Sequence, residues 1–169
     1  RQVLTAGVLA GVLIGVALSL VWLVYINATP AVPVLGRRPG TETFRSIDEC
    51  PDCEILGGLL VVRFDAGLFF ASADALEDRL RKLAQDSEGD LDSVVVSFEG
   101  VDFIDSQGSE KVAKIHQLAR TYDIELHLAR VKPAVLDLLE RDGVTELLGD
   151  DHIHGSVFEA ASDHIPNAP

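Results

Sequence analysis

The 169-residue sequence has no methionine, only two cysteines, and too few basic residues to balance its acids. It contains 14 lysines and arginines against 27 aspartates and glutamates, so its formal net charge is −13. Nucleic-acid backbones are bound by clustered Lys and Arg, so this deficit argues against a nucleic-acid partner. Because the chain lacks Met and begins with Arg1, we expect it to be a fragment of a longer protein.

The two cysteines form a single CxxC pair, Cys50 and Cys53, in an acidic segment between two expected strands. A redox-active CxxC sits at the end of a strand and opens a helix, which lowers the pKa of the thiol. A zinc site would need further ligands, and no second CxxC exists. We therefore interpret the pair as a feature of a loop rather than as a catalytic or metal site.

Charge is absent from Gln2 to Gly36, and residues 3–26 form an apolar run of membrane-spanning length. Trp22 and Tyr25 fall near one end of the run, where amphipathic rings favour the headgroup level. We expect residues 1–28 to form a transmembrane helix. Arg37 and Arg38 follow it, and excess positive charge marks the cytoplasmic side, so the domain after the helix is expected in the cytoplasm.

Gly7, Gly11 and Gly15 repeat at a spacing of four residues and share one face of the expected helix. Small residues at that spacing let helices approach closely inside a bilayer. We favour a helix that packs within a multi-pass bundle. A single-span anchor and a secretory signal are the alternatives, although the run exceeds a usual signal core and lacks a clear cleavage site.

The rest of the chain is expected to form a Pro- and Gly-rich extended linker at 29–41, a compact domain at 42–164 and a tail at 165–169. Strands and helices alternate in the domain, which favours an α/β fold with a parallel or mixed sheet. We predict strands at 43–47, 59–64, 93–98 and 124–128. We predict helices that start near Ser72, after Asp105 and at Pro133, and a short last helix in 155–163.

Three segments together resemble the SulP (sulfate permease) anion transporters, from their last membrane helix through their STAS domain. The segment 34–45, with Gly36, Arg37 and Arg38, resembles the junction after the membrane helix. Residues 60–72 look like the first long STAS strand and its following turn, and residues 103–108 look like the STAS signature turn. The resemblance covers nearly the whole chain.

This resemblance implies a STAS-like mixed β-sheet with helices packed mainly on one face. It also implies a cytoplasmic regulatory and assembly domain of a sulfate-class secondary transporter in the cell membrane. The expected partners are the membrane domain of the transporter and a second copy of the full-length protein. The alternative is a membrane-anchored signalling module that resembles anti-sigma-factor antagonists and has no transport role.

Related anti-sigma-factor antagonists are phosphorylated on a hydroxyl residue just before the signature glycine, and here that position is Gln107. An amide cannot accept a phosphoryl group, so we expect that switch to be absent. Ser106 and Ser109 flank it, and a phosphate on either would lie near a helix N-terminus. We favour the simpler reading in which Asp105 or Ser106 caps the helix.

The resemblance also implies a possible weak nucleotide-binding or docking surface, although no cofactor is required. GTP or GDP would lie between the turn at residues 65–72 (the 65–72 turn) and the turn at residues 103–109 (the 103–109 turn). The candidate residues are Phe70, Ala71, Ser72, Asp105, Ser106, Gln107, Gly108 and Ser109. No Gly-Lys-Ser phosphate loop is present, so binding would be weak.

No paired carboxylates, Ser-His-Asp set or nucleophile elbow supports an enzyme. His152, His154 and His164 cluster with acids near the C-terminus, but we interpret them as a solvated tail and assign no metal site. The transported anion is not determined by these residues, since selectivity would lie in earlier membrane helices.

Overall fold

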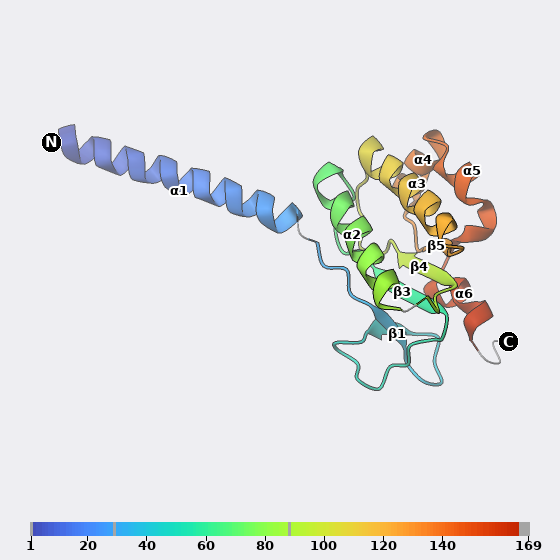
Figure 1. Ribbon diagram of the computed structural model, residues 1–169. Helices are drawn as coiled ribbons and strands as arrows, with labels where there is room; N and C mark the ends of the chain where they lie inside the picture. Colours follow the sequence, from blue (N-terminus) through green and yellow to red (C-terminus); the bar gives the residue numbers. More distant parts are fainter. Residues whose placement is uncertain (1, 29, 88, 166–169) are drawn as a thin grey trace.

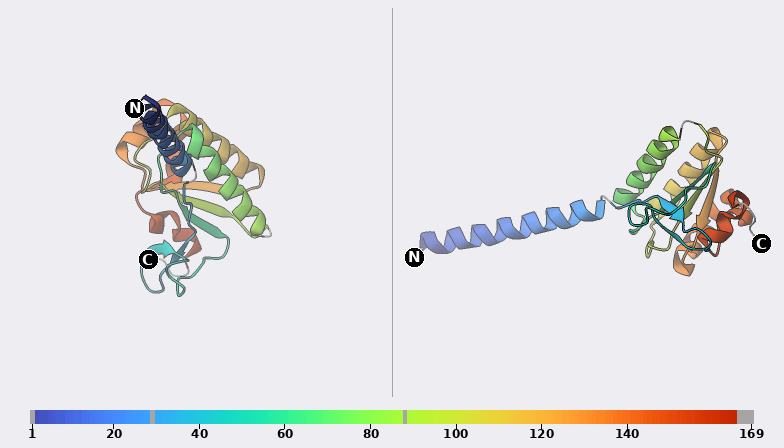
Figure 2. Two further views of the ribbon diagram at one scale, coloured as in Figure 1. Left: turned by 90° about the vertical axis from the view of Figure 1, so that its left-hand side faces the viewer. Right: turned by 90° about the horizontal axis from the view of Figure 1, so that it is seen from below.

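In the computed structural model, residues 2–28, 30–87 and 89–165 are described, and they form a long helix followed by an α/β domain (Figure 1). The helix, α1 (Gln2–Ala28), projects away from the domain, as the right-hand view of Figure 2 also shows. Its large apolar side chains from Val8 to Tyr25 are exposed. Among the described residues it is the one helix long and apolar enough to cross a membrane, over Gly7–Tyr25.

The domain is built on four parallel strands in sequential order, β3 (Leu59–Arg63), β4 (Ser93–Ser97), β5 (Glu125–Ala129) and β6 (Ile153–His154). Every residue of β4 is buried, as expected for a β-branched run between two neighbouring strands. The strands β3, β4 and β5 were predicted from sequence, each within one residue of its observed bounds at either end.

Most helices pack on one face of this sheet. The helices on this face are α2 (Phe70–Asp86), α3 (Ser106–Thr121), α4 (Pro133–Arg141) and α5 (Val144–Leu148), while α6 (Val157–Ala160) packs on the other (Figure 1). Side chains along β3 point alternately to the two faces of the sheet. Leu60 and Val62 pack in the larger hydrophobic core on one face, and Leu59 and Val61 pack in the smaller core on the other. The expected STAS-like architecture is therefore confirmed.

A short antiparallel pair, β1 (Leu35–Arg37) and β2 (Phe44–Ser46), precedes the sheet. Val34 forms an antiparallel bridge to Val62 and so attaches this segment to β3, which makes the strand arrangement mixed. The expectation of an extended linker over 29–41 missed β1, and Val32, Val34 and Leu35 are buried in the domain.

Several helix boundaries differ from the sequence expectation. Pro133 is the first residue of α4, as predicted, and Gly143 beyond the end of α4 has φ +74°, the left-handed conformation in which many helices end. In contrast, α5, β6 and the short 3₁₀ helix η1 (Asp150–His152) were not predicted. Instead of the single last helix expected in 155–163, the structure has α6 followed by the short 3₁₀ helix η2 (Ser162–His164).

Candidate functional site

The 65–72 turn and the 103–109 turn meet beyond the carboxyl ends of β3 and β4. The Leu68 amide donates to the Phe103 carbonyl at 2.8 Å, and the Asp105 amide donates to the Leu68 carbonyl at 3.2 Å. Leu68 and Ile104 also form a parallel bridge. The structure therefore brings together the two turns that the sequence singled out, as an extension of the β3–β4 pairing.

Asp105 is the residue that caps α3. Its backbone is extended, and its Oδ1 accepts a hydrogen bond from the Gly108 amide at 2.7 Å. Ser106 is the first helical residue, and its side chain is exposed. Two residues were considered as the cap from sequence. The assignment to Asp105 is confirmed and the assignment to Ser106 is wrong, because only Asp105 precedes the helix with the required backbone conformation.

Gly108 occupies the point where α3 approaches the 65–72 turn. A Cβ atom at this position would lie 2.2 Å from the Leu68 carbonyl oxygen and 3.1 Å from a side-chain carbon of Ile104. Any side chain would force the helix away from the turn. The glycine that helped to mark the STAS resemblance is thus required by a close backbone contact.

The sequence suggested that Ser72 caps α2 from the position before the helix, and this is wrong. The helix begins at Phe70, two residues before Ser72, and Phe69 occupies the cap position. The Ser72 hydroxyl is buried, donates to the Gly67 carbonyl at 2.6 Å and accepts from the Phe69 amide at 3.1 Å. Ser72 therefore holds the turn together from inside, while the side chains of Phe70 and Ala71 lie outside the described part of the structure.

The hydroxyls next to Gln107 differ in access. Ser109 is fully buried, and its Oγ has no hydrogen-bond partner among the described atoms. Ser106 and Gln107 are exposed. Of the two hydroxyls, only that of Ser106 is therefore accessible from solvent in the folded domain.

Lysines around the two turns are already paired with carboxylates. Lys111 of α3 contacts Asp74 at 2.6 Å and Glu77 at 2.7 Å, both on α2. Hydrogen bonds from Lys111 lower the pKa values of Asp74 and Glu77, and those carboxylates raise the pKa of Lys111.

Two more lysines near the turns are paired in the same way. Lys114 pairs with Glu110 on α3, and Lys132 pairs with Asp102 from the loop after β4. Together with Lys111, these ion pairs leave little uncompensated positive charge for a polyphosphate at this edge of the sheet.

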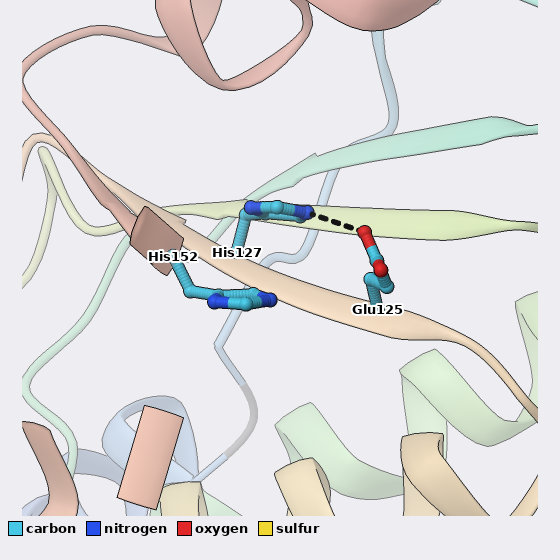
Figure 3. A group of neighbouring side chains, drawn as sticks. All are labelled: Glu125, His127 and His152. Carbon is cyan, nitrogen blue, oxygen red and sulfur yellow. Dashed lines mark ion pairs between the residues drawn. The ribbon is translucent and has the colours of Figure 1, made fainter. Parts of the chain in front are cut away.

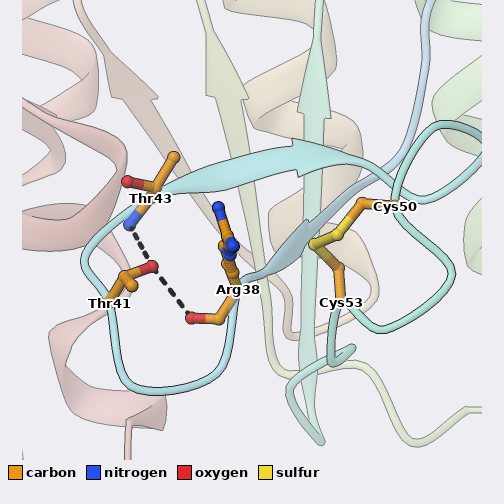
Figure 4. The surroundings of a disulfide bond; sticks show 5 residues. All are labelled: Arg38, Thr41, Thr43, Cys50 and Cys53. Atoms are coloured by element: carbon orange, nitrogen blue, oxygen red, sulfur yellow. Dashed lines mark hydrogen bonds between the residues drawn. A yellow bond between two sulfur atoms is a disulfide. The ribbon is translucent and has the colours of Figure 1, made fainter.

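The cysteine pair lies in a loop beside the β1–β2 hairpin, away from any helix start (Figure 4). Cys50 and Cys53 form a disulfide with a Cα–Cα distance of 5.4 Å, a bond that the sequence analysis did not predict. The loop location agrees with the interpretation from sequence. In this oxidised form neither sulfur is free to act as a nucleophile or metal ligand.

The C-terminal histidines are not simply a solvated tail. His152 and His154 lie against His127 of β5, a residue that the sequence analysis did not select, and beside Glu125. The signal that could have found them is the alternation of Glu125 and His127 on one face of a strand. His164 lies elsewhere, next to Gly58 and Asp92.

A parallel sheet covered mainly on one face, with a helix packed through a glycine onto the neighbouring turn, defines a STAS-like α/β domain. Residues 51–160 match the STAS domain family, and the chain belongs to that family.

Known proteins similar to this chain are named as transporters. "Probable sulfate transporter 4.2" of Arabidopsis thaliana is 33% identical over 174 residues, which cover 96% of this chain and 26% of that protein. The Arabidopsis "Sulfate transporter 4.1, chloroplastic" is 32% identical, over 91% of this chain and 24% of its own length. The chain thus spans about a quarter of the length of these relatives.

Solved structures show the same fold at low sequence identity. The murine anion transporter Slc26a9 superposes with a TM-score of 0.80 at 18% identity, covering 92% of this chain and 25% of that one. A SulP transporter STAS domain from Vibrio cholerae gives 0.56 at 17% identity, over 69% of this chain and 88% of its own.

Proposed function

We propose that this chain is the cytoplasmic regulatory and assembly domain, with its attached membrane helix, of a secondary transporter for an inorganic anion of the sulfate class. The observation that carries the proposal is the extent of the similarity to a relative named a sulfate transporter, which covers 96% of the chain and so includes most of α1 as well as the domain. The domain would act through contacts with the membrane domain and in a homodimer of the full-length protein, and not as an enzyme or a nucleic-acid binder.

Sulfate uptake by the full-length protein tests this role. In proteoliposomes it should take up labelled sulfate, and excess unlabelled sulfate should compete while an uncharged solute should not. Vesicles without protein serve as the control. Inserted, folded protein that moves no inorganic anion would overturn the proposal and favour the signalling module that has one span and no transport.

The orientation of the domain can be tested separately. Arg37 and Arg38, directly after α1, support a cytoplasmic location. A single exposed cysteine, Thr121→Cys in a Cys50→Ser/Cys53→Ser background, should react with a membrane-impermeant thiol reagent only after cells are permeabilised. Labelling of intact cells would place the domain outside. In a reducing cytoplasm the Cys50–Cys53 disulfide seen in the structure would be reduced to two thiols in most cells.

We propose further that the joined turns form a docking surface that binds guanine nucleotide weakly. The contact of Leu68 with Phe103 and Asp105 supports a shared surface, whereas the paired lysines argue for low affinity. Titration with GTP and Mg²⁺ should shift amide signals of residues 105–109 at millimolar ligand. Unmoved signals would dismiss nucleotide binding without affecting the transport proposal.

A further inference from the structure

Glu125, His127 and His152 form a compact group of side chains on β5 and η1 (Figure 3). One nitrogen or oxygen atom from each lies within 4.8 Å of the others. Glu125 and His127 are two residues apart on β5, so they point to the same side of the sheet. The His127 and His152 rings stack with centroids 4.7 Å apart (Figure 3).

His154 holds the His127 ring from the opposite end. Parallel pairing of β5 with β6 places Ala129 opposite His154, and Nδ1 of His127 lies 3.0 Å from Nε2 of His154. When His127 donates its Nδ1 proton to His154, Nε2 of His127 carries a lone pair. Metal-binding histidines commonly donate their second ring nitrogen in this way, which fixes the ring and its tautomer.

The other side of His127 lacks a matching hydrogen bond. Its Nε2 lies 3.6 Å from a carboxylate oxygen of Glu125, which is longer than a hydrogen bond. The ring nitrogen and the carboxylate therefore face each other as two electron-pair donors. A cation between them would satisfy both, and imidazole with carboxylate is a ligand set suited to Zn²⁺.

The surroundings of the group carry negative charge, which attracts a cation. Asp151, Glu159 and Asp163 face His154 and add negative potential around the group. The net charge of the whole chain, −13, acts in the same direction.

We propose that Glu125, His127 and His152 bind one divalent transition-metal ion, with Zn²⁺ as the reference ion and His154 supporting His127. Tetrahedral bonds of about 2.0–2.1 Å require ligand atoms about 3.3 Å apart. On binding, the ligand atoms would draw together from within 4.8 Å of one another, and the stacked rings of His127 and His152 would turn so that their nitrogens face the ion. The fourth position is open to water or to a side chain from a partner. The bound ion ties the chain after α5 to β5.

Calorimetry of the full chain in detergent micelles tests the site. The sample carries no histidine tag and has Cys50→Ser/Cys53→Ser, so that neither a tag nor thiols compete for the ion. Zn²⁺ should bind at one ion per chain with a dissociation constant in the low micromolar range. Each of Glu125→Gln, His127→Gln and His152→Ala should weaken binding about tenfold or more. Because His164 lies outside the group, His164→Gln is the matched control and should bind as the parent does.

Two results would overturn the proposal: no saturable binding below about 100 μM free Zn²⁺, or equal binding by the parent and all three ligand variants. If a variant fails to fold, imidazole proton signals of the parent decide the outcome. Added Zn²⁺ should move the signals of His127 and His152 and leave His164 in place. Movement of His164 alone would assign the ion to another part of the chain.

Discussion

At the scale of single residues, Asp105 and Ser106 are neighbours with different roles, because only Asp105 accepts a hydrogen bond from the first turn of α3. Asp105→Ala should therefore lower the free energy of unfolding by about 1 kcal/mol. Ser106→Ala, at an exposed first helical position, should change it by a few tenths at most. Urea denaturation followed by circular dichroism measures both, and equal losses in the two variants would contradict the assignment of the cap.

Gly108 gives a second test at this scale, because the missing Cβ makes room for the Leu68 carbonyl. Gly108→Ala should destabilise the domain by about 1–3 kcal/mol, as expected for overpacking. Gly57→Ala is the matched control, since nothing lies within 4 Å of its Cβ position and its φ is not in the left-handed region. Thermal unfolding should separate the two variants, and identical midpoints would count against a tight contact between α3 and Leu68.

At the scale of elements, long buried segments were predictable from sequence, and of the short strands only β2 was, by the strand expected at 43–47. The strand β4 has a continuous β-branched run, which is sufficient to predict it. The strands β1 and β6 have three and two residues and form only because β2 and β5 lie beside them. These strands depend on pairing with distant parts of the chain, which cannot be predicted from the local sequence pattern.

The same limit applies to the candidate sites. The 103–109 turn was found because its residues are contiguous. The group around His127 was missed as a unit because its members are contributed by β5 and η1, which are separated along the chain by α4 and α5. The start of α2 was misplaced because Ser72, a good cap by type, instead bonds to Gly67 and Phe69 within the turn.

A buried histidine of α3, His116, should make the free energy of unfolding depend on pH. His116 is buried, and neither ring nitrogen has a partner among the described atoms. Burial, and then the charges of Arg120 and His152, lower the pKa of His116 below its usual 6.5. The unfolded chain therefore binds this proton more readily, so the free energy of unfolding should fall as the pH drops below about 6.5.

Denaturation midpoints between pH 8 and pH 5, in the presence of a chelator, measure this effect. His116→Leu should lose less stability over that range than the parent protein. Part of the loss should persist, because His127 and His154 also have lowered pKa values. An unchanged slope in the variant would show that His116 does not take up a proton on unfolding.

At the scale of the whole molecule, α1 offers a face of small residues with open space around them. Nothing lies within 4 Å of the Cβ positions of Gly7, Gly11 and Gly15. If this face packs against other membrane helices, Gly11→Leu should reduce sulfate uptake by the full-length protein about fivefold or more, through overpacking of roughly 1–3 kcal/mol. Ala17→Leu, off that face, is the size-matched control and should keep its uptake at equal expression.

The connection between α1 and the sheet limits how far the two can move apart. The helix ends at Ala28, and the Ala31 carbonyl already accepts a hydrogen bond from the Asp65 amide beside the end of β3. Three residue steps span at most about 11 Å when fully extended. A displacement of the helix end beyond this tether must either pull the edge of β3 along with it or break the Ala31–Asp65 hydrogen bond. Movement within a bilayer would thus reach the sheet as a mechanical load on its first strand.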